Sequence, residues 1–308
     1  MTERSYEVVV VGAGPAGLST ALVLGRSRRR TLLVDGGAGR NAPAAGVHGM
    51  LGWDGSPDEL RSAGLRQLRD YPDVDMRTGR LPKVAGRRDE FTVMFDDGAV
   101  VDARRIVLAT GVAEDLPDVA GVAERWGRSV FGCPYCHAWE VRDRPLAVLA
   151  TGGDEDAVFA AQLMQWSSEI TLCTNGFDVA DLHIARGRGV SVRTEEVRRI
   201  DGRDGGVEKV VFAAGVPLPC AAVFVHATTH QASELPGELG CAVLADGSVR
   251  VDDTGRTSVP GIYAVGDSAR RQASPSGATS VVSAAATGFI TATTVNQDLF
   301  LASLERSP

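Results

Sequence analysis

The chain has 308 residues, 44% of them hydrophobic and 23% charged, which is the composition of a globular enzyme with room for two domains. Its formal net charge of −7 argues against a nucleic-acid partner, because such a partner requires a basic surface. The longest apolar runs fall far short of a membrane span and no targeting signal is visible before the first strand, so we expect a cytoplasmic protein with no membrane contact.

The first elements along the chain are a strand, a glycine turn, a helix and a second strand. Residues 6–11 include four consecutive valines, which is typical of a buried parallel strand. The sequence GAGPAG follows, and residues 18–25 are predicted to be helical. Residues 31–35 form a second strand that ends in an acid, whereas residues 36–73 are rich in glycine, proline and alanine and are expected on the surface. This order indicates a nucleotide-binding βαβ unit.

The glycine turn has the spacing of a dinucleotide-binding motif. Gly12 permits the tight turn, Gly14 lets a pyrophosphate approach the backbone, and Gly17 packs the helix against the strand. Asp35, at the end of the second strand, is placed to accept a hydrogen bond from a ribose hydroxyl. Together with the flanking strand and helix, these residues predict a bound dinucleotide. The alternative is a glycine turn without a ligand.

A hairpin and a second βαβ unit follow. Residues 89–101 alternate around an Asp-Asp-Gly turn, as in an antiparallel hairpin, and residues 105–110 are a buried strand that closes with Ala-Thr-Gly. A strand, a glycine turn, a helix and a strand over residues 146–173 repeat the first unit. A strand with a Gly-Asp pair returns at residues 258–269, and a helix is predicted over 280–293.

These segments predict an α/β protein with two Rossmann-like nucleotide-binding domains. A second hairpin around residues 201–206 and the strand 222–225 extend the second domain. The order along the chain places that domain inside the first, so we expect domain boundaries at 1–115, 116–243 and 244–308.

Two of the five cysteines form a CxxC pair in the segment CPYCHAWE. Cys133 and Cys136, at the predicted start of a helix, can close a small disulfide ring, and a helix N-terminus lowers the pKa of a thiol there. This favours thiol–disulfide exchange or electron transfer to a flavin. A zinc site would need two further ligands at suitable spacing, and no second CxxC is present, so we expect no metal. Inert structural cysteines are the other alternative, and the remaining three cysteines are expected in the core.

These motifs, in this order, resemble the low-molecular-weight thioredoxin reductases over nearly the whole chain. The shared features are the first glycine motif, the Ala-Thr-Gly segment, the CxxC pair, the late Gly-Asp pair and an Arg-Gln-Ala segment before the last helix. The resemblance implies FAD in the split domain and a homodimer. It also implies that Cys136 faces the flavin and Cys133 exchanges with the substrate. The FAD contacts expected on this basis are Gly12, Gly14, Pro15, Ala16, Gly17, Asp35, Gly36, Arg40, Asn41, His48, Ala109, Thr110, Gly111, Gly266, Asp267, Gln272 and Ala273.

The residues after the CxxC pair differ from those of thioredoxin reductases, which carry an aspartate directly after the second cysteine. Here the segment resembles the dithiol oxidases of gliotoxin and holomycin biosynthesis, which have a Cys-Pro-x-Cys-His core. We expect His137 to act as the acid–base group near neutral pH. Glu140 either orients the His137 ring or is a solvated side chain. Trp139 either forms an aromatic wall of a substrate site or has a plain packing role. His48, in the similar stretch VHGMLGWDG, is an active-site or a turn histidine.

The second glycine turn departs from a pyridine-nucleotide site. Residues 150–155 read ATGGDE, so the first glycine is Ala150 and an acid, Glu155, occupies the sixth position, where it would repel a pyrophosphate. In place of the arginines that clamp a 2′-phosphate the chain has residues 174–176, Thr-Asn-Gly. We therefore expect no productive NADPH binding, and electrons that enter from substrate thiols.

This direction of electron flow predicts an oxidase. The leading hypothesis is an FAD-dependent oxidase that converts a small-molecule dithiol into a disulfide, with O2 as acceptor and H2O2 as product. The alternatives are a thioredoxin reductase-type enzyme that uses NADPH or ferredoxin, and a flavin-binding redox sensor without catalysis. The sequence does not identify the substrate.

Overall fold

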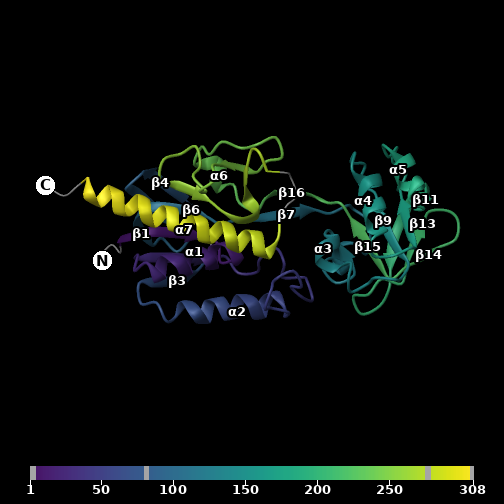
Figure 1. Ribbon diagram of the computed structural model, residues 1–308, viewed down its shortest axis with the longest axis horizontal. Helices are drawn as coiled ribbons and strands as arrows, with labels where there is room; N and C mark the ends of the chain where they lie inside the picture. The colour runs from purple at the N-terminus through teal and green to yellow at the C-terminus, as the bar shows by residue number, and fades with distance from the viewer. Residues whose placement is uncertain (1–4, 80–82, 275–278, 306–308) are drawn as a thin grey trace. The chain divides into compact units, whose positions relative to one another are not determined.

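The computed structural model describes residues 5–79, 83–274 and 279–305, and it divides into two compact units (Figure 1). The first unit comprises Met1–Ala42, Gly55–Ala113 and His230–Pro308, and the second comprises Pro43–Asp54 and Glu114–Thr229. The second unit thus contains a short early segment as well as the long insertion. Among the described residues, no helix is both long and apolar enough to cross a bilayer.

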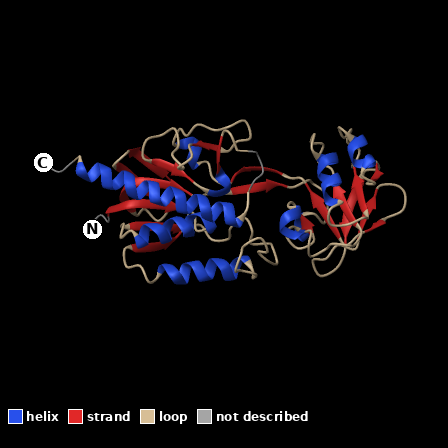
Figure 2. Cartoon of the chain, viewed as in Figure 1, coloured by secondary structure: helices blue, strands red, loops and turns tan. Residues whose placement is uncertain are grey.

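The first unit is built on a seven-stranded sheet with the order β3-β2-β1-β6-β5-β4, in which β18 also pairs with β6. The neighbours of β1 run parallel to it, and β4, β5 and β6 form an antiparallel meander. Helices lie against this sheet (Figure 2). The strands of this sheet are β1 (Ser5–Val11), β2 (Thr31–Asp35), β3 (Val74–Thr78), β4 (Lys83–Arg87), β5 (Glu90–Met94), β6 (Val100–Leu108) and β18 (Ile262–Ala264). A separate two-stranded sheet pairs β17 (Val249–Val251) with β19 (Ala269–Arg271).

Both faces of β1 are buried, which explains its unbroken run of valines. Val8 and Val10 belong to the hydrophobic cluster on one face, and Val9 and Val11 belong to the cluster on the other. Because strand side chains alternate between faces, every position is apolar where both faces are covered, from Val8 to Val11, whereas the polar residues Ser5 and Glu7 lie at the less buried start of the strand. The predicted strand at the start of the chain is confirmed.

The described α-helices of the first unit are α1 (Pro15–Arg26), α2 (Pro57–Leu68), α6 (Leu235–Glu238) and α7 (Val281–Leu304), and a 3-10 helix spans Gly266–Ser268. Figure 1 shows α7 running alongside α1, and the approach is close because a Cβ at Gly288 would lie only 2.3 Å from the carbonyl oxygen of Ala16. The last helix, α7, continues to Leu304 and is therefore much longer than the predicted 280–293. The surface expected over residues 36–73 contains α2, whose start is fixed by a capping box between Ser56 and Glu59.

The second unit repeats the nucleotide-binding pattern. Its parallel sheet has the order β11-β10-β9-β15-β8, and a three-stranded antiparallel sheet β12-β13-β14 contains the predicted second hairpin. Two hydrophobic clusters cover this unit's strands. Its elements are β8 (Val130–Phe131), α3 (Pro134–His137), β9 (Leu146–Leu149), α4 (Asp156–Leu163), β10 (Ile170–Cys173), α5 (Leu182–Gly187), β11 (Ser191–Arg193), β12 (Val197–Asp201), β13 (Lys209–Phe212), β14 (Leu218–Pro219) and β15 (Ala222–Val225).

The paired strands β7 (Val112–Asp115) and β16 (Thr228–Gln231) carry the chain between the two units. The segment predicted as the insertion, 116–243, covers most of the second unit. It also extends into α6, whose Leu235 is buried in the core of the first unit together with Cys241. The split α/β fold with two Rossmann-like sheets matches the prediction.

Candidate active site

The first glycine turn lies between β1 and α1. Gly12 has φ +110°, and a Cβ there would lie 2.2 Å from the carbonyl oxygen of Ala109; a Cβ on Gly17 would lie 1.8 Å from the carbonyl oxygen of Gly12. Gly14, by contrast, would meet nothing within 4 Å. Gly12 and Gly17 therefore allow close packing, and Gly14 leaves open space at the N-terminus of a twelve-residue helix.

Asp35 ends β2, as predicted, and its carboxylate is held in place. It accepts a hydrogen bond from the backbone N–H of Gly37 at 2.9 Å and forms an ion pair with Arg61 of α2. Arg61 was not foreseen, because α2 itself lay in a stretch predicted only as surface. Arg61 fixes the direction of the Asp35 carboxylate, the group predicted to accept a hydrogen bond from a ribose.

The late Gly-Asp pair follows β18 and lies beside the loop after β2. Arg40 donates from Nη1 to the Asp267 carboxylate at 2.7 Å and to the Thr279 hydroxyl at 3.0 Å. The structure thus brings together two predicted cofactor contacts, Arg40 and Asp267, that are far apart in the sequence. Thr110 follows β6, and its hydroxyl is buried without a hydrogen-bond partner in the described part of the chain. The exposed members of the predicted set are Gly36, Asn41, His48, Gln272 and Ala273. His48 belongs to the second unit, whereas the other predicted cofactor contacts belong to the first.

The CxxC pair lies in the second unit and forms a disulfide between Cys133 and Cys136. Cys133 immediately precedes α3, and Pro134 is the first helical residue. The helix α3 has only four residues, so its dipole is small. A helix of this length gives weaker support than a long one for the lowered thiol pKa that the sequence predicts. Both cysteines are half-buried.

His137 directly follows the pair and packs face to face on Phe131, with ring centroids 4.6 Å apart. Burial lowers the pKa of His137, the charge of His48 lowers it further, and the Glu140 carboxylate raises it in opposition. The net shift is downward, so the imidazole is neutral and keeps a lone pair at neutral pH. This is the state that a general base requires.

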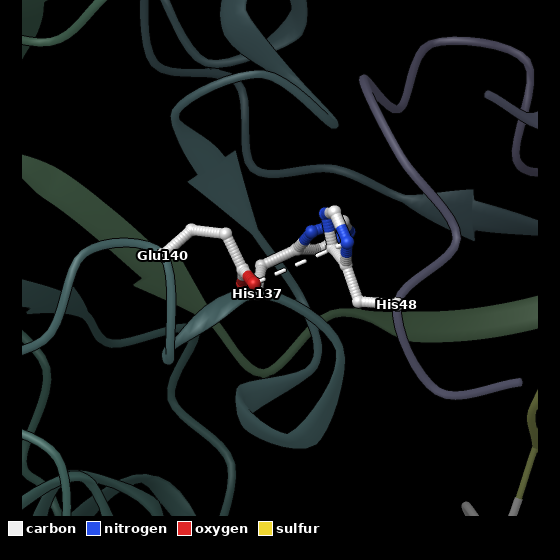
Figure 3. A group of neighbouring side chains, drawn as sticks. All are labelled: His48, His137 and Glu140. Carbon is white, nitrogen blue, oxygen red and sulfur yellow. Dashed lines mark ion pairs between the residues drawn. The ribbon is translucent and has the colours of Figure 1, made fainter. Parts of the chain in front are cut away.

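His48 lies next to His137, within the same unit (Figure 3). Their rings meet edge to face, with centroids 6.0 Å apart. Three atoms, one ring nitrogen of each histidine and one carboxylate oxygen of Glu140, lie within 4.8 Å of one another. Nδ1 of His48 is 2.9 Å from Oδ1 of Asp54 and 4.0 Å from Oε1 of Glu140. The sequence singled out both histidines and Glu140 but missed Asp54, although it lies in the same stretch as His48.

Aromatic side chains flank the disulfide. Tyr135, between the two cysteines, is exposed, and its hydroxyl accepts a hydrogen bond from the Gln162 amide at 2.8 Å. Trp139 is also exposed, and the Arg142 guanidinium lies 4.0 Å over its ring. These contacts hold two aromatic rings at the surface beside the redox pair.

The second glycine turn, between β9 and α4, is occupied by a side chain of the protein. The Asp156 carboxylate accepts hydrogen bonds from the backbone N–H groups of Thr151, Gly152 and Gly153 at 3.0, 2.9 and 3.1 Å, and Asp156 is fully buried. In a nucleotide site these N–H groups face the pyrophosphate. The sequence predicts repulsion of a pyrophosphate by Glu155, whose side chain is exposed. The side chain that occupies the turn is that of the next residue, Asp156.

The segment in place of the arginine clamp is a structural turn. Thr174 is buried, and Asn175 adopts a positive φ of 53° while its side-chain oxygen accepts a hydrogen bond from the backbone N–H of Val197 at 2.7 Å. These three positions therefore provide no cation for a 2′-phosphate.

Comparisons with known proteins agree with this geometry. The model of the pyridine nucleotide-disulphide oxidoreductase family matches residues 6–288. A probable thioredoxin reductase of Arthroderma benhamiae is 30% identical over 86% of this chain and 74% of its own. Thioredoxin reductase sirT of Leptosphaeria maculans is 29% identical over 86% and 87%. The crystal structure of HlmI superimposes with a TM-score of 0.89 at 37% identity, over 98% of this chain and 96% of that one.

Proposed function

Because the chain belongs to the pyridine nucleotide-disulphide oxidoreductase family, we propose that it is a dithiol oxidase that forms a disulfide in a small molecule. It is a thioredoxin reductase-like disulfide oxidoreductase whose redox centre is the Cys133–Cys136 disulfide. The observation that carries the proposal is the Asp156 carboxylate in the second glycine turn. With that turn filled, the electrons come from substrate thiols, and O2 accepts them to give H2O2.

FAD is the cofactor of this family, and the first glycine turn fits it. The open space at Gly14 accommodates a pyrophosphate, and Asp35 is directed for a ribose. The Thr110 hydroxyl, which has no partner among the described residues, offers a hydrogen bond. We propose these residues and the Arg40–Asp267 pair as FAD contacts, together with the other predicted residues of the first unit. Bound FAD supplies a two-electron acceptor for the reduced cysteines and a donor to O2.

NADPH is a poor electron donor here on energetic grounds. A pyrophosphate would have to displace a buried carboxylate from three charge-assisted hydrogen bonds, each worth about 1.5–3 kcal/mol. It would also meet the acids Asp154 and Glu155 without a cationic clamp in residues 174–176. These costs oppose the reductase alternative that depends on NADPH.

The chain's own residues account for thiol exchange. A substrate thiol gives its proton to His137, and the resulting thiolate attacks the sulfur of Cys133, so that the disulfide bond breaks and Cys136 leaves as a thiolate. The second substrate thiol then attacks the mixed disulfide and releases Cys133. The substrate loses two electrons and the cysteine pair gains them. The exposed rings of Tyr135 and Trp139 favour an apolar small molecule beside the pair.

A second copy of the chain is the partner expected from the resemblance. The outer face of α7 carries large apolar side chains that are exposed along its length, and a helix face of this kind favours a protein partner. We propose it as the homodimer surface. Its exposed residues are Val282, Phe289, Ile290, Phe300, Leu301 and Leu304.

An anaerobic reduction experiment tests the oxidase function. The purified flavoprotein is mixed with NADPH, with reduced ferredoxin, or with a small dithiol, and the flavin absorbance is followed. We expect bleaching by the dithiol alone, and H2O2 when air is admitted. The Cys136→Ser variant should not bleach. Bleaching by NADPH or ferredoxin but not by the dithiol would establish the reductase alternative instead.

A further inference from the structure

Dithiol oxidation requires His137 to take up and release more than one proton. Each substrate thiol must lose a proton before its sulfur attacks, so a base beside the disulfide takes one proton and has to be freed again before it takes the next. His137 is half-buried, and Phe131 covers one face of its ring at 4.6 Å. A route from His137 to solvent is therefore required.

The side chains around His137 provide such a route. His48 is the nearest imidazole, with ring nitrogens of the two residues within 4.8 Å, a separation that one water molecule can bridge. Nδ1 of His48 is in turn 2.9 Å from Asp54, whose side chain is 82% exposed. From this geometry we propose that His48 and Asp54 form the outer half of a proton relay that carries protons between His137 and solvent. This inference rests on the dithiol oxidase function.

An imidazole passes a proton by taking one at one nitrogen and losing another at the opposite nitrogen. When Asp54 accepts a hydrogen bond from Nδ1–H of His48, the second ring nitrogen, Nε2, keeps a lone pair that can receive a proton from His137 by way of water. The N–H at Nδ1 is then released toward Asp54 and water. His48 does not need to contact the substrate, so it acts as a positioning and relay residue.

Repulsion between the two rings disfavours a second proton on the pair. His48 and His137 disfavour simultaneous protonation, because two imidazolium ions at this separation repel each other. Asp54 Oδ1 lies 2.9 Å from Nδ1 of His48, and Glu140 Oε1 lies 4.0 Å from the same nitrogen while its charge also acts on His137. A proton on His48 therefore keeps His137 neutral and ready for the second thiol.

The relay is tested by the anaerobic rate of flavin reduction by a small dithiol in His48→Gln and Asp54→Asn. We expect each variant to be slowed by roughly tenfold, less than the loss of about 10²-fold or more expected when His137, a direct acid–base group, is replaced. Added imidazole should restore the rate of His48→Ala but not of Cys136→Ser. The matched control is His183→Gln, since His183 is another exposed histidine of the second unit, 3.8 Å from Asp181. It should react at the wild-type rate.

The outcomes separate the relay from the function on which it rests. If the dithiol does not bleach the wild-type flavin, the oxidase function itself fails. If the wild type is bleached and both His48→Gln and Asp54→Asn match it, the relay is wrong. A slow His48→Ala that imidazole does not restore, with normal flavin content, also overturns the relay, because it indicates a purely structural role.

Discussion

Removal of the Asp156 carboxylate should convert the second glycine turn into an anion site. In Asp156→Ala, three backbone N–H groups lose their shared acceptor while the turn between β9 and α4 keeps its course. A single lost helix-capping acceptor costs about 0.5–2 kcal/mol. Because three donors are affected, we expect the free energy of unfolding to fall by about 2–4 kcal/mol.

The assay compares thermal unfolding of the wild type and the variant in chloride and in phosphate at equal ionic strength. Phosphate that occupies the vacated turn at about ten times its Kd would return about 1.4 kcal/mol to Asp156→Ala and nothing to the wild type. Asp154→Ala, which changes an exposed acid of the same turn, is the control and should behave like the wild type. Equal stabilisation of all three proteins by phosphate would refute the view that Asp156 replaces a phosphate group.

Three further results are expected. The pKa of His137 is lowered, so dithiol-driven flavin reduction should stay fast below the ordinary histidine pKa. In the rate–pH profile, His48→Gln should move the acid limb to higher pH, because it removes a charge that lowers the pKa of His137. Glu140→Gln should move the acid limb to lower pH, because it removes a charge that raises this pKa. Phe289→Asp should convert the dimer to a monomer by light scattering without loss of FAD, and a wild-type monomer would contradict the proposed α7 surface. Gly12→Ala places a Cβ 2.2 Å from a backbone carbonyl oxygen at a positive φ, so it should abolish FAD incorporation and destabilise the protein by about 3 kcal/mol or more, as absorbance and thermal unfolding would show.

The parts of the fold that the sequence predicts are those with local causes. Four adjacent valines require a strand covered on both faces, and the spacing of Gly12, Gly14 and Gly17 requires a tight strand-to-helix turn. The CxxC pair is likewise a local feature, and its disulfide forms as expected. The length of α7 was underestimated because its second half is amphipathic, with buried Val295 and Leu299 beside exposed residues, and lacks the small-residue pattern of its first half.

The parts that the sequence did not predict depend on tertiary structure. No local pattern brings His48 beside His137, since the two residues lie on separate segments that only the second unit joins. Asp156 lies just beyond the glycine motif, whose sixth position is Glu155, and only the turn geometry shows which of the adjacent acids faces the backbone N–H groups. The start of α2 could have been found, since Ser56 and Glu59 have the spacing of a capping box.

The packing of α7 on α1 has a consequence for the order of folding during synthesis. The core of the first unit joins Val8 and Leu24 to Val295 and Leu299, so it cannot close until the last helix has left the ribosome. The second unit lies between residues 43 and 229 and can complete its own core earlier. We therefore expect the redox disulfide segment to be folded on the nascent chain while the cofactor-binding sheet still lacks the helix that covers it.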